Sequence, residues 1–149
     1  MAGSFKTHKG TFTPKFPSKY LGNAGNIVYR SGWERKAMKF FDETKDVINW
    51  ASEEIVIPYV SPVDNQYHRY FPDFWARVRR PNGEITEYMI EVKPKAQTQP
   101  PVAKSNRKTN RYLQEVLTYG VNIAKWKAAV QICKKRGWEF MLMTEDELG

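Results

Sequence analysis

Two strand-like runs, Tyr67–Arg79 and Ile85–Lys93, constrain the fold of this chain most strongly, because a short turn-forming segment joins them. Both runs are rich in aromatic and β-branched residues, which favour extended backbone. The joining segment, residues 80–84, reads Arg-Pro-Asn-Gly-Glu, and its proline and its Asn-Gly pair favour a tight reversal. The sequence therefore predicts an antiparallel β-hairpin here.

Three elements are expected before this hairpin. Residues Gly32–Glu43 should form a helix, because Ser31 and Glu34 match a capping box and apolar residues follow at helical spacing. The β-branched stretch that comes next predicts a strand at Glu53–Ile57, and residues 61–66 should form a turn.

The segment after the hairpin is expected to begin with a loop over residues 94–106, which contains three prolines and has no periodicity. The elements predicted beyond it are a helix over Thr109–Tyr119, a break near Gly120, a second helix over Asn122–Arg136 with Asn122 as its N-cap and Gly137 after its end, a strand over Trp138–Met143, and a short helix opened by a capping box at Thr144.

The predicted order is therefore α-β-β-β-α-α-β, which indicates a mixed α/β domain with a central sheet flanked by helices. A length of 149 residues fits one domain. Residues 1–28 are rich in Pro, Gly and Lys without a regular period, so we expect a basic, irregular N-terminal arm before a folded domain over residues 29–149. The single cysteine, Cys133, fits a reducing cytoplasm and argues against structural zinc.

The net charge of +8 is concentrated in two segments that contain no acidic residue. These segments, residues 1–30 and 93–111, hold 11 of the 24 basic residues, which leaves 13 against all 16 acids elsewhere. Such concentrated positive charge suggests a polyanionic partner such as DNA, although a basic surface that only increases solubility is the alternative.

A possible reaction centre lies on the predicted hairpin. Side chains alternate along a strand, so Glu91 and Lys93 share one face, and Asp73 lies on the neighbouring strand. Two adjacent carboxylates are the usual protein ligands of Mg²⁺, and a lysine beside them can offset charge that develops on a phosphate. This combination indicates phosphodiester hydrolysis.

Each of these residues also has an ordinary structural interpretation. Glu34 could serve only as a helix cap, Glu91 and Lys93 could be a solvated strand face, and Asp73 after a proline could be part of a turn. The combination of all four favours a site. The basic residues expected to contact DNA near it are Lys95, Lys104, Arg107, Lys108 and Arg111 of the following segment, Arg69 beside the site, and Lys15 and Lys19 of the N-terminal arm.

The sequence Phe71-Pro72-Asp73 followed by Ile90-Glu91-Val92-Lys93 resembles the signature of the PD-(D/E)xK, or restriction-endonuclease-like, superfamily. The resemblance implies that Asp73 and Glu91 bind Mg²⁺, for which Mn²⁺ can substitute. It also implies that Glu34 contributes to a metal or its water, and that Lys93 assists the attacking water. The activity it implies is endonucleolytic cleavage of DNA.

A closer resemblance covers nearly the whole chain. The segments 29–34, 50–53, 56–59, 91–101 and 125–129 resemble the head-completion nucleases of T-even-like tailed phages, and a related core occurs in transposon end-cutting endonucleases. This implies phage head or neck proteins as partners, and location in the host cytoplasm or at the virion head and neck. Two other readings stay open: a non-catalytic head or neck protein that keeps the fold and binds DNA, and an RNA-binding module.

Overall fold

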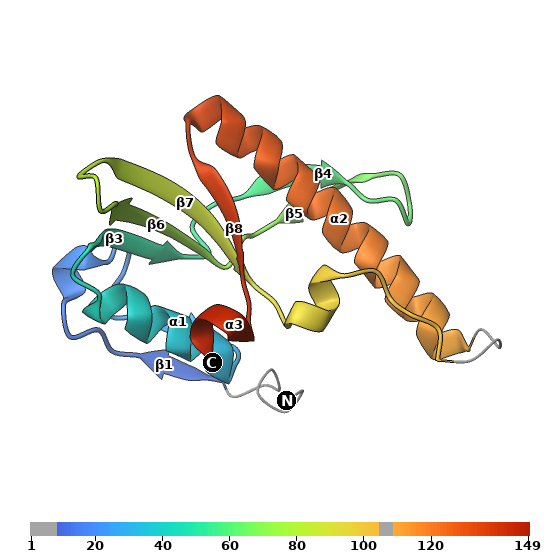
Figure 1. Cartoon of the computed structure of the whole chain (residues 1–149), viewed down its shortest axis with the longest axis horizontal. Coiled ribbons are helices and arrows are strands. Elements are labelled where there is room, and N and C mark those ends of the chain that lie inside the picture. Colours follow the sequence, from blue (N-terminus) through green and yellow to red (C-terminus); the bar gives the residue numbers. More distant parts are fainter. Residues whose placement is uncertain (1–8, 105–108) are drawn as a thin grey trace.

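A four-stranded sheet forms the centre of the computed structural model, which describes residues 9–104 and 109–149 (Figure 1). Its strands, in spatial order, are β3 (Val47–Ser52), β6 (Phe74–Arg79), β7 (Ile85–Val92) and β8 (Glu139–Met143). The first three are antiparallel to their neighbours, whereas β8 runs parallel to β7. The mixed α/β class predicted from the sequence is confirmed.

The predicted hairpin is present as β6 and β7, with Phe74 opposite Ile90 and Arg79 opposite Ile85. In its turn the Arg80 N–H donates to the Glu84 carbonyl at 2.7 Å, and Gly83 has φ of 88°, which favours glycine.

The run Tyr67–Arg79, however, is not one strand. Its first part, β5 (Tyr67–Tyr70), pairs with β4 (Ile57–Val60) in a separate two-stranded sheet. Pro72 lies in the break before β6, where the lack of an N–H removes no ladder hydrogen bond.

The predicted strand at Glu53–Ile57 is wrong, because β3 ends at Ser52 and β4 begins only at Ile57. Glu53 has a left-handed backbone with φ of 55°, and its N–H donates to the Asp73 carbonyl at 3.1 Å. A contact between segments far apart in the sequence therefore ends the strand.

One face of the central sheet is covered by α1 (Gly32–Glu43), whose bounds agree with the prediction. Its buried face and the sheet form the larger part of the core, which includes Trp33, Ala37, Met38, Phe41, Trp50, Phe74, Ala76 and Ile90. The apolar residues of α1 recur at helical spacing and form one face of the helix, which packs on the sheet.

The other face is covered by α2 (Asn110–Arg136), a single helix where two were predicted. A glycine inside a helix costs about 1 kcal/mol relative to alanine, and burial of Trp126, Ala129 and Cys133 farther along the helix outweighs this cost. Asn122 is therefore buried inside the helix and is not an N-cap, whereas Gly137 ends the helix with φ of 72°, as expected. The β4–β5 sheet contributes Ile57, Tyr59 and Tyr70 to this side of the core.

The N-terminal arm, predicted to be irregular, is partly regular within residues 9–28. Strand β1 (Gly10–Phe12) pairs with β2 (Ile27–Tyr29), and a 3-10 turn, η2 (Pro17–Lys19), lies between them. The arm is held on α1 because the buried Asp42 carboxylate accepts the N–H groups of Lys15 and Phe16 at 2.8 and 3.2 Å. The arm also adds Tyr20 and Ile27 to the core.

The chain after β8 forms α3 (Glu145–Leu148), which carries the predicted capping box: Thr144 N–H donates to Glu147 Oε1 at 2.6 Å. A second 3-10 turn, η3 (Lys95–Thr98), follows β7, so the observed order contains more strands and fewer long helices than the predicted one. Within the described residues no helix combines the length and the apolar character that crossing a membrane requires.

Candidate active site

Asp73 and Glu91, here called the carboxylate pair, meet where β6 begins and β7 ends. The register that pairs Phe74 with Ile90 brings Asp73 opposite Glu91. The Asp73 Oδ2 atom accepts the N–H of Val92 at 2.8 Å, which holds this carboxylate against β7. Both acids belong to one hairpin. The turn between β6 and β7 and the alternation of side chains along each strand therefore bring them together.

Glu91 is only 7% exposed, and two side chains contact its carboxylate. The Tyr70 hydroxyl donates to Oε1 at 2.8 Å, and the Lys93 ammonium lies 3.7 Å from Oε2. Glu91 and Lys93 therefore share one face, as strand alternation predicted.

Glu34 lies at the start of α1, and its local hydrogen bonds differ from a complete capping box. Its N–H donates to Ser31 Oγ at 3.1 Å, but its carboxylate accepts the N–H of Arg30 at 3.1 Å and not that of Ser31. The charges of Glu53 and Glu91 also act on this carboxylate. Glu34 thus takes part in the N-terminal cap of α1, and its charge interacts with those of Glu91 and Asp73.

Burial raises the pKa of all three acids, and the charges of neighbouring acids raise the pKa of Asp73 and of Glu34 further. Burial has the largest effect on the pKa of Asp73, and the negative charge of Glu91 raises it further. The pKa of Glu91 is raised by burial, although Lys93 and the Tyr70 hydroxyl oppose this shift. Burial raises the pKa of Glu34 as well. The surrounding protein thus supplies too little positive charge to stabilise the ionised acids fully.

A divalent cation would relieve this repulsion, and the donor set fits Mg²⁺. No group of three or more His, Cys, Asp or Glu side chains in the described part of the chain forms a complete protein cage for a metal. Mg²⁺ needs no such cage, since one or two carboxylates with waters and phosphate oxygens are its usual ligands. The carboxylate pair fits this kind of site, and Mg²⁺ binding itself and Glu34 as a direct ligand stay predictions.

Two residues of the site were not singled out from the sequence. Tyr70 belongs to β5, and Lys125 belongs to α2, where its ammonium lies 5.6 Å from the centre of the Tyr70 ring and 5.8 Å from that of Tyr59. The positive charge of Lys125 lowers the pKa of Glu91. No spacing rule links these elements to the hairpin, so only the fold could have revealed them.

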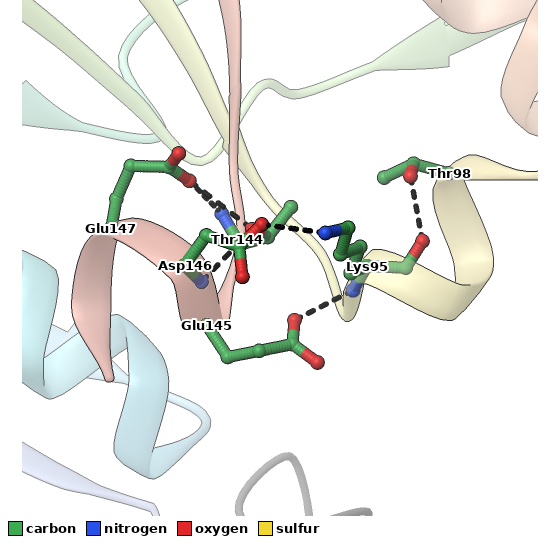
Figure 2. A network of polar contacts seen from close by, with 6 residues as sticks. All are labelled: Lys95, Thr98, Thr144, Glu145, Asp146 and Glu147. Carbon is green, nitrogen blue, oxygen red and sulfur yellow. Dashed lines mark hydrogen bonds and ion pairs between the residues drawn. The ribbon is translucent and has the colours of Figure 1, made fainter.

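The basic residues predicted to bind DNA have different surroundings. Lys95, in η3, is held against α3: its N–H donates to Glu145 at 2.7 Å and its ammonium lies 3.0 Å from Asp146, as Figure 2 shows. Figure 2 also shows Thr98, which closes the turn by donating to the Lys95 carbonyl. The charge of Lys95 is therefore partly neutralised by neighbouring acids.

Lys104 and Arg111 line a groove between the segment after η3 and the first half of α2, and both are exposed. Arg111 lies 4.0 Å from Glu115. The predicted residues Arg107 and Lys108 lie outside the described residues.

The remaining predicted contacts lie on β5 and on the N-terminal arm. Arg69 is exposed, with its guanidinium 5.7 Å from the centre of the Phe71 ring. Lys15 lies 3.7 Å from Glu43, whereas the Lys19 ammonium donates to the carbonyls of Asp42 and Thr44 at 2.8 and 2.9 Å. Lys19 thus has a structural role in holding the arm, and a role in DNA binding stays a prediction for all three.

Comparison with known proteins agrees with this geometry. A family model described as "TnsA-like endonuclease N terminal" matches residues 44–145, a range that contains Asp73, Glu91 and Lys93. The chain belongs to this endonuclease family. The range matched by the family model does not include Glu34, which lies before it.

A relative of this TnsA-like chain is the "Head completion nuclease" of Enterobacteria phage T4. The two sequences are 40% identical over 144 residues, which cover 95% of this chain and 93% of the relative. Both resemblances noted from the sequence are therefore confirmed. No solved structure matches the chain.

Proposed function

We propose that this protein is a Mg²⁺-dependent DNA endonuclease that acts in completion of a phage head, with Mn²⁺ able to replace Mg²⁺. The observation that carries the proposal is the carboxylate pair with Lys93, 3.7 Å from Glu91, at the end of β7. Membership of the TnsA-like family and the name of the phage T4 relative support the same reaction class.

In this proposal Asp73 and Glu91 hold the metal, which when bound polarises a phosphate oxygen and activates water. The Val92 N–H keeps Asp73 oriented, and the Tyr70 hydroxyl keeps Glu91 oriented. Lys93 orients the attacking water and stabilises negative charge on the phosphate. A bond forms between the water oxygen and phosphorus as this water gives up a proton to solvent, one phosphorus–oxygen ester bond breaks, and the departing oxygen takes up a proton from solvent. Glu34 would accept or hold a water at the edge of the pair.

The proposed setting follows from the relative, whose name places it in head completion. We propose that the protein acts on packaged DNA ends in the host cytoplasm, with phage head or neck proteins on the portal side as partners, and that it stays with the virion. Because one such carboxylate pair is present in residues 9–104 and 109–149, one chain would cut one strand at a time.

The test is cleavage of linear and branched DNA in Mg²⁺ or Mn²⁺ by wild type, Asp73→Asn and Lys93→Met. Both variants should lose activity by about 100-fold or more, because each removes a group that stabilises the transition state. Asp64→Asn and Lys127→Met are matched controls: both residues are exposed, and neither belongs to the site.

Metal-dependent cleavage that is lost only in the site variants would support the nuclease. Wild type that binds DNA but never cuts it, in either metal, would instead favour the non-catalytic DNA-binding head protein.

A further inference from the structure

The amide of a buried asparagine faces the groove beside α2 without a hydrogen-bonding partner. Asn122 as a residue is 6% exposed, and its amide makes no hydrogen bond within the described residues. The amide atoms themselves are not fully buried, so they reach the groove and can donate to water or to a ligand there. Asn122 lies in the helix interior, where it contributes neither a cap nor apolar packing.

The groove that Asn122 lines has a volume of about 710 Å³. It lies between the segment that follows η3 and the first half of α2, which run side by side in Figure 1. Amide and basic side chains, including Gln97, Gln99, Lys104 and Arg111, line part of it, and Glu115 and apolar residues such as Pro100, Pro101 and Val102 line the rest. Lys104 and Arg111 outnumber the single acid, Glu115, and together with the amide donors they can bind an anionic ligand along the polar part of the groove.

Lys125 lies one helical turn beyond Asn122, on the same side of α2. Its ammonium lies over the rings of Tyr70 and Tyr59, at 5.6 and 5.8 Å from their centres. No carboxylate of residues 9–104 and 109–149 lies within ion-pair distance of it. The two rings keep the cation in place, so its charge is available to a ligand.

Lys125 is close to the candidate active site. Tyr70, which lies under the Lys125 ammonium, donates its hydroxyl to Glu91, and the charge of Lys125 acts on Glu91 as well. An anion held by Asn122 and Lys125 would therefore lie beside the phosphate that the carboxylate pair would bind.

We propose that Asn122 and Lys125 form a phosphate-binding site that holds a DNA backbone phosphate next to the one that is cut. The inference rests on the proposed function for its ligand. The Lys125 ammonium supplies charge, and the Asn122 amide donates a hydrogen bond to a phosphate oxygen. The groove guides the same strand away from the carboxylate pair.

Metal-free binding of a labelled DNA duplex at several salt concentrations tests the site without any cleavage. Each phosphate contact adds about 0.9 to the slope of log affinity against log salt. Lys125→Met should therefore lower that slope by about 1 and weaken binding about tenfold at moderate salt. Lys127→Met removes the same charge from an exposed position of the same helix and should leave the slope unchanged.

Further variants separate phosphate binding from a structural role. Lys125→Arg should restore the slope, since it keeps the charge over the two rings. Asn122→Asp keeps the side-chain shape but should weaken binding more than Asn122→Leu, because a carboxylate repels phosphate. Thermal unfolding of each variant checks that the fold is intact.

The outcomes distinguish this inference from the proposed function. A folded Lys125→Met protein with wild-type affinity and slope would overturn the phosphate site even if wild type cuts DNA. A reduced slope would uphold the site even if wild type never cuts. Wild type that does not bind the duplex at all would overturn it.

Discussion

At the scale of single residues, Asp73 brings stability and the proposed chemistry into conflict. Its pKa in the folded protein is raised by burial and by Glu91, so the folded state favours the protonated acid. A group of this kind stabilises the fold fully below its ordinary pKa, and this stability is lost as the pH rises through the raised pKa.

We therefore expect Asp73→Asn to be more stable than wild type at pH 8 without divalent metal. The neutral amide can still accept the Val92 N–H, but it avoids the buried charge. A gain of about 1 kcal/mol would raise the melting temperature by about 2–4 °C. The gain should disappear below about pH 4, which thermal unfolding across a pH series measures.

Asp64→Asn is the control for this effect. Asp64 is exposed, and hydrogen bonds from the Gln66 N–H and from His68 lower its pKa. Its replacement should give no gain at pH 8. If Asp73→Asn is no more stable than wild type in metal-free buffer at pH 8, the buried charge of Asp73 does not destabilise the fold.

Tyr70 is expected to orient Glu91 through its 2.8 Å hydrogen bond. Tyr70→Phe should lower kcat about tenfold, because Glu91 loses a positioning contact worth about 1.5 kcal/mol. The hydroxyl also favours the ionised carboxylate, so its loss should raise the pKa of Glu91 and shift the acidic limb of the pH–rate profile to higher pH. Tyr67→Phe, at a position that is 79% exposed, should change neither quantity. An unaltered profile in Tyr70→Phe would exclude the positioning role.

At the scale of elements, two glycines of α2 should respond in opposite ways to alanine. Gly137 ends the helix in a left-handed conformation, so Gly137→Ala should destabilise the protein by about 1 kcal/mol. Gly120 lies inside the helix, and an added Cβ there would meet only Pro62, at 3.9 Å. Gly120→Ala should therefore stabilise by about 0.5–1 kcal/mol. Denaturant unfolding measures the free energy of unfolding of the two variants. A loss of stability in Gly120→Ala would mean that the helix needs flexibility at this point.

The elements that could be predicted are those whose causes are local. Helix Gly32–Glu43 begins at the Ser31 cap and follows apolar spacing, and the β6–β7 turn depends on its own Asn82-Gly83 pair. The incorrect strand at 53–57 has a distant cause, since Glu53 donates to Asp73. The break predicted at Gly120 was wrong for a similar reason: packing far along α2 decides that the helix continues.

The same distinction applies to the candidate site. Asp73, Glu91 and Lys93 come from one hairpin. Side-chain alternation along the strands and the predicted turn were therefore enough to predict that they lie together. Lys125 reaches the site from a helix on the far side of a long loop, and Tyr70 reaches it from a different sheet. Nothing in their own neighbourhoods marks them as partners of Glu91.

At the scale of the whole molecule, metal binding should be visible as stability. A ligand that binds only the folded state stabilises it by about 1.4 kcal/mol when its concentration is ten times its dissociation constant. Mg²⁺ should therefore raise the melting temperature of wild type by about 3–6 °C. The matched protein is Asp73→Asn, whose melting temperature should barely respond. An equal response of both proteins would mean that Mg²⁺ binds elsewhere.

The parallel pairing of β8 with β7 has a consequence for the timing of activity during synthesis. Lys93 N–H donates to the Met143 carbonyl at 2.9 Å, so the strand that carries Glu91 gains its second neighbour only from residues 139–143. Domains fold as their segments leave the ribosome, and pairing between distant segments comes late. A nascent chain would thus remain inactive until residues 139–143 have emerged and paired with β7, which protects nearby nucleic acid from an incompletely folded nuclease.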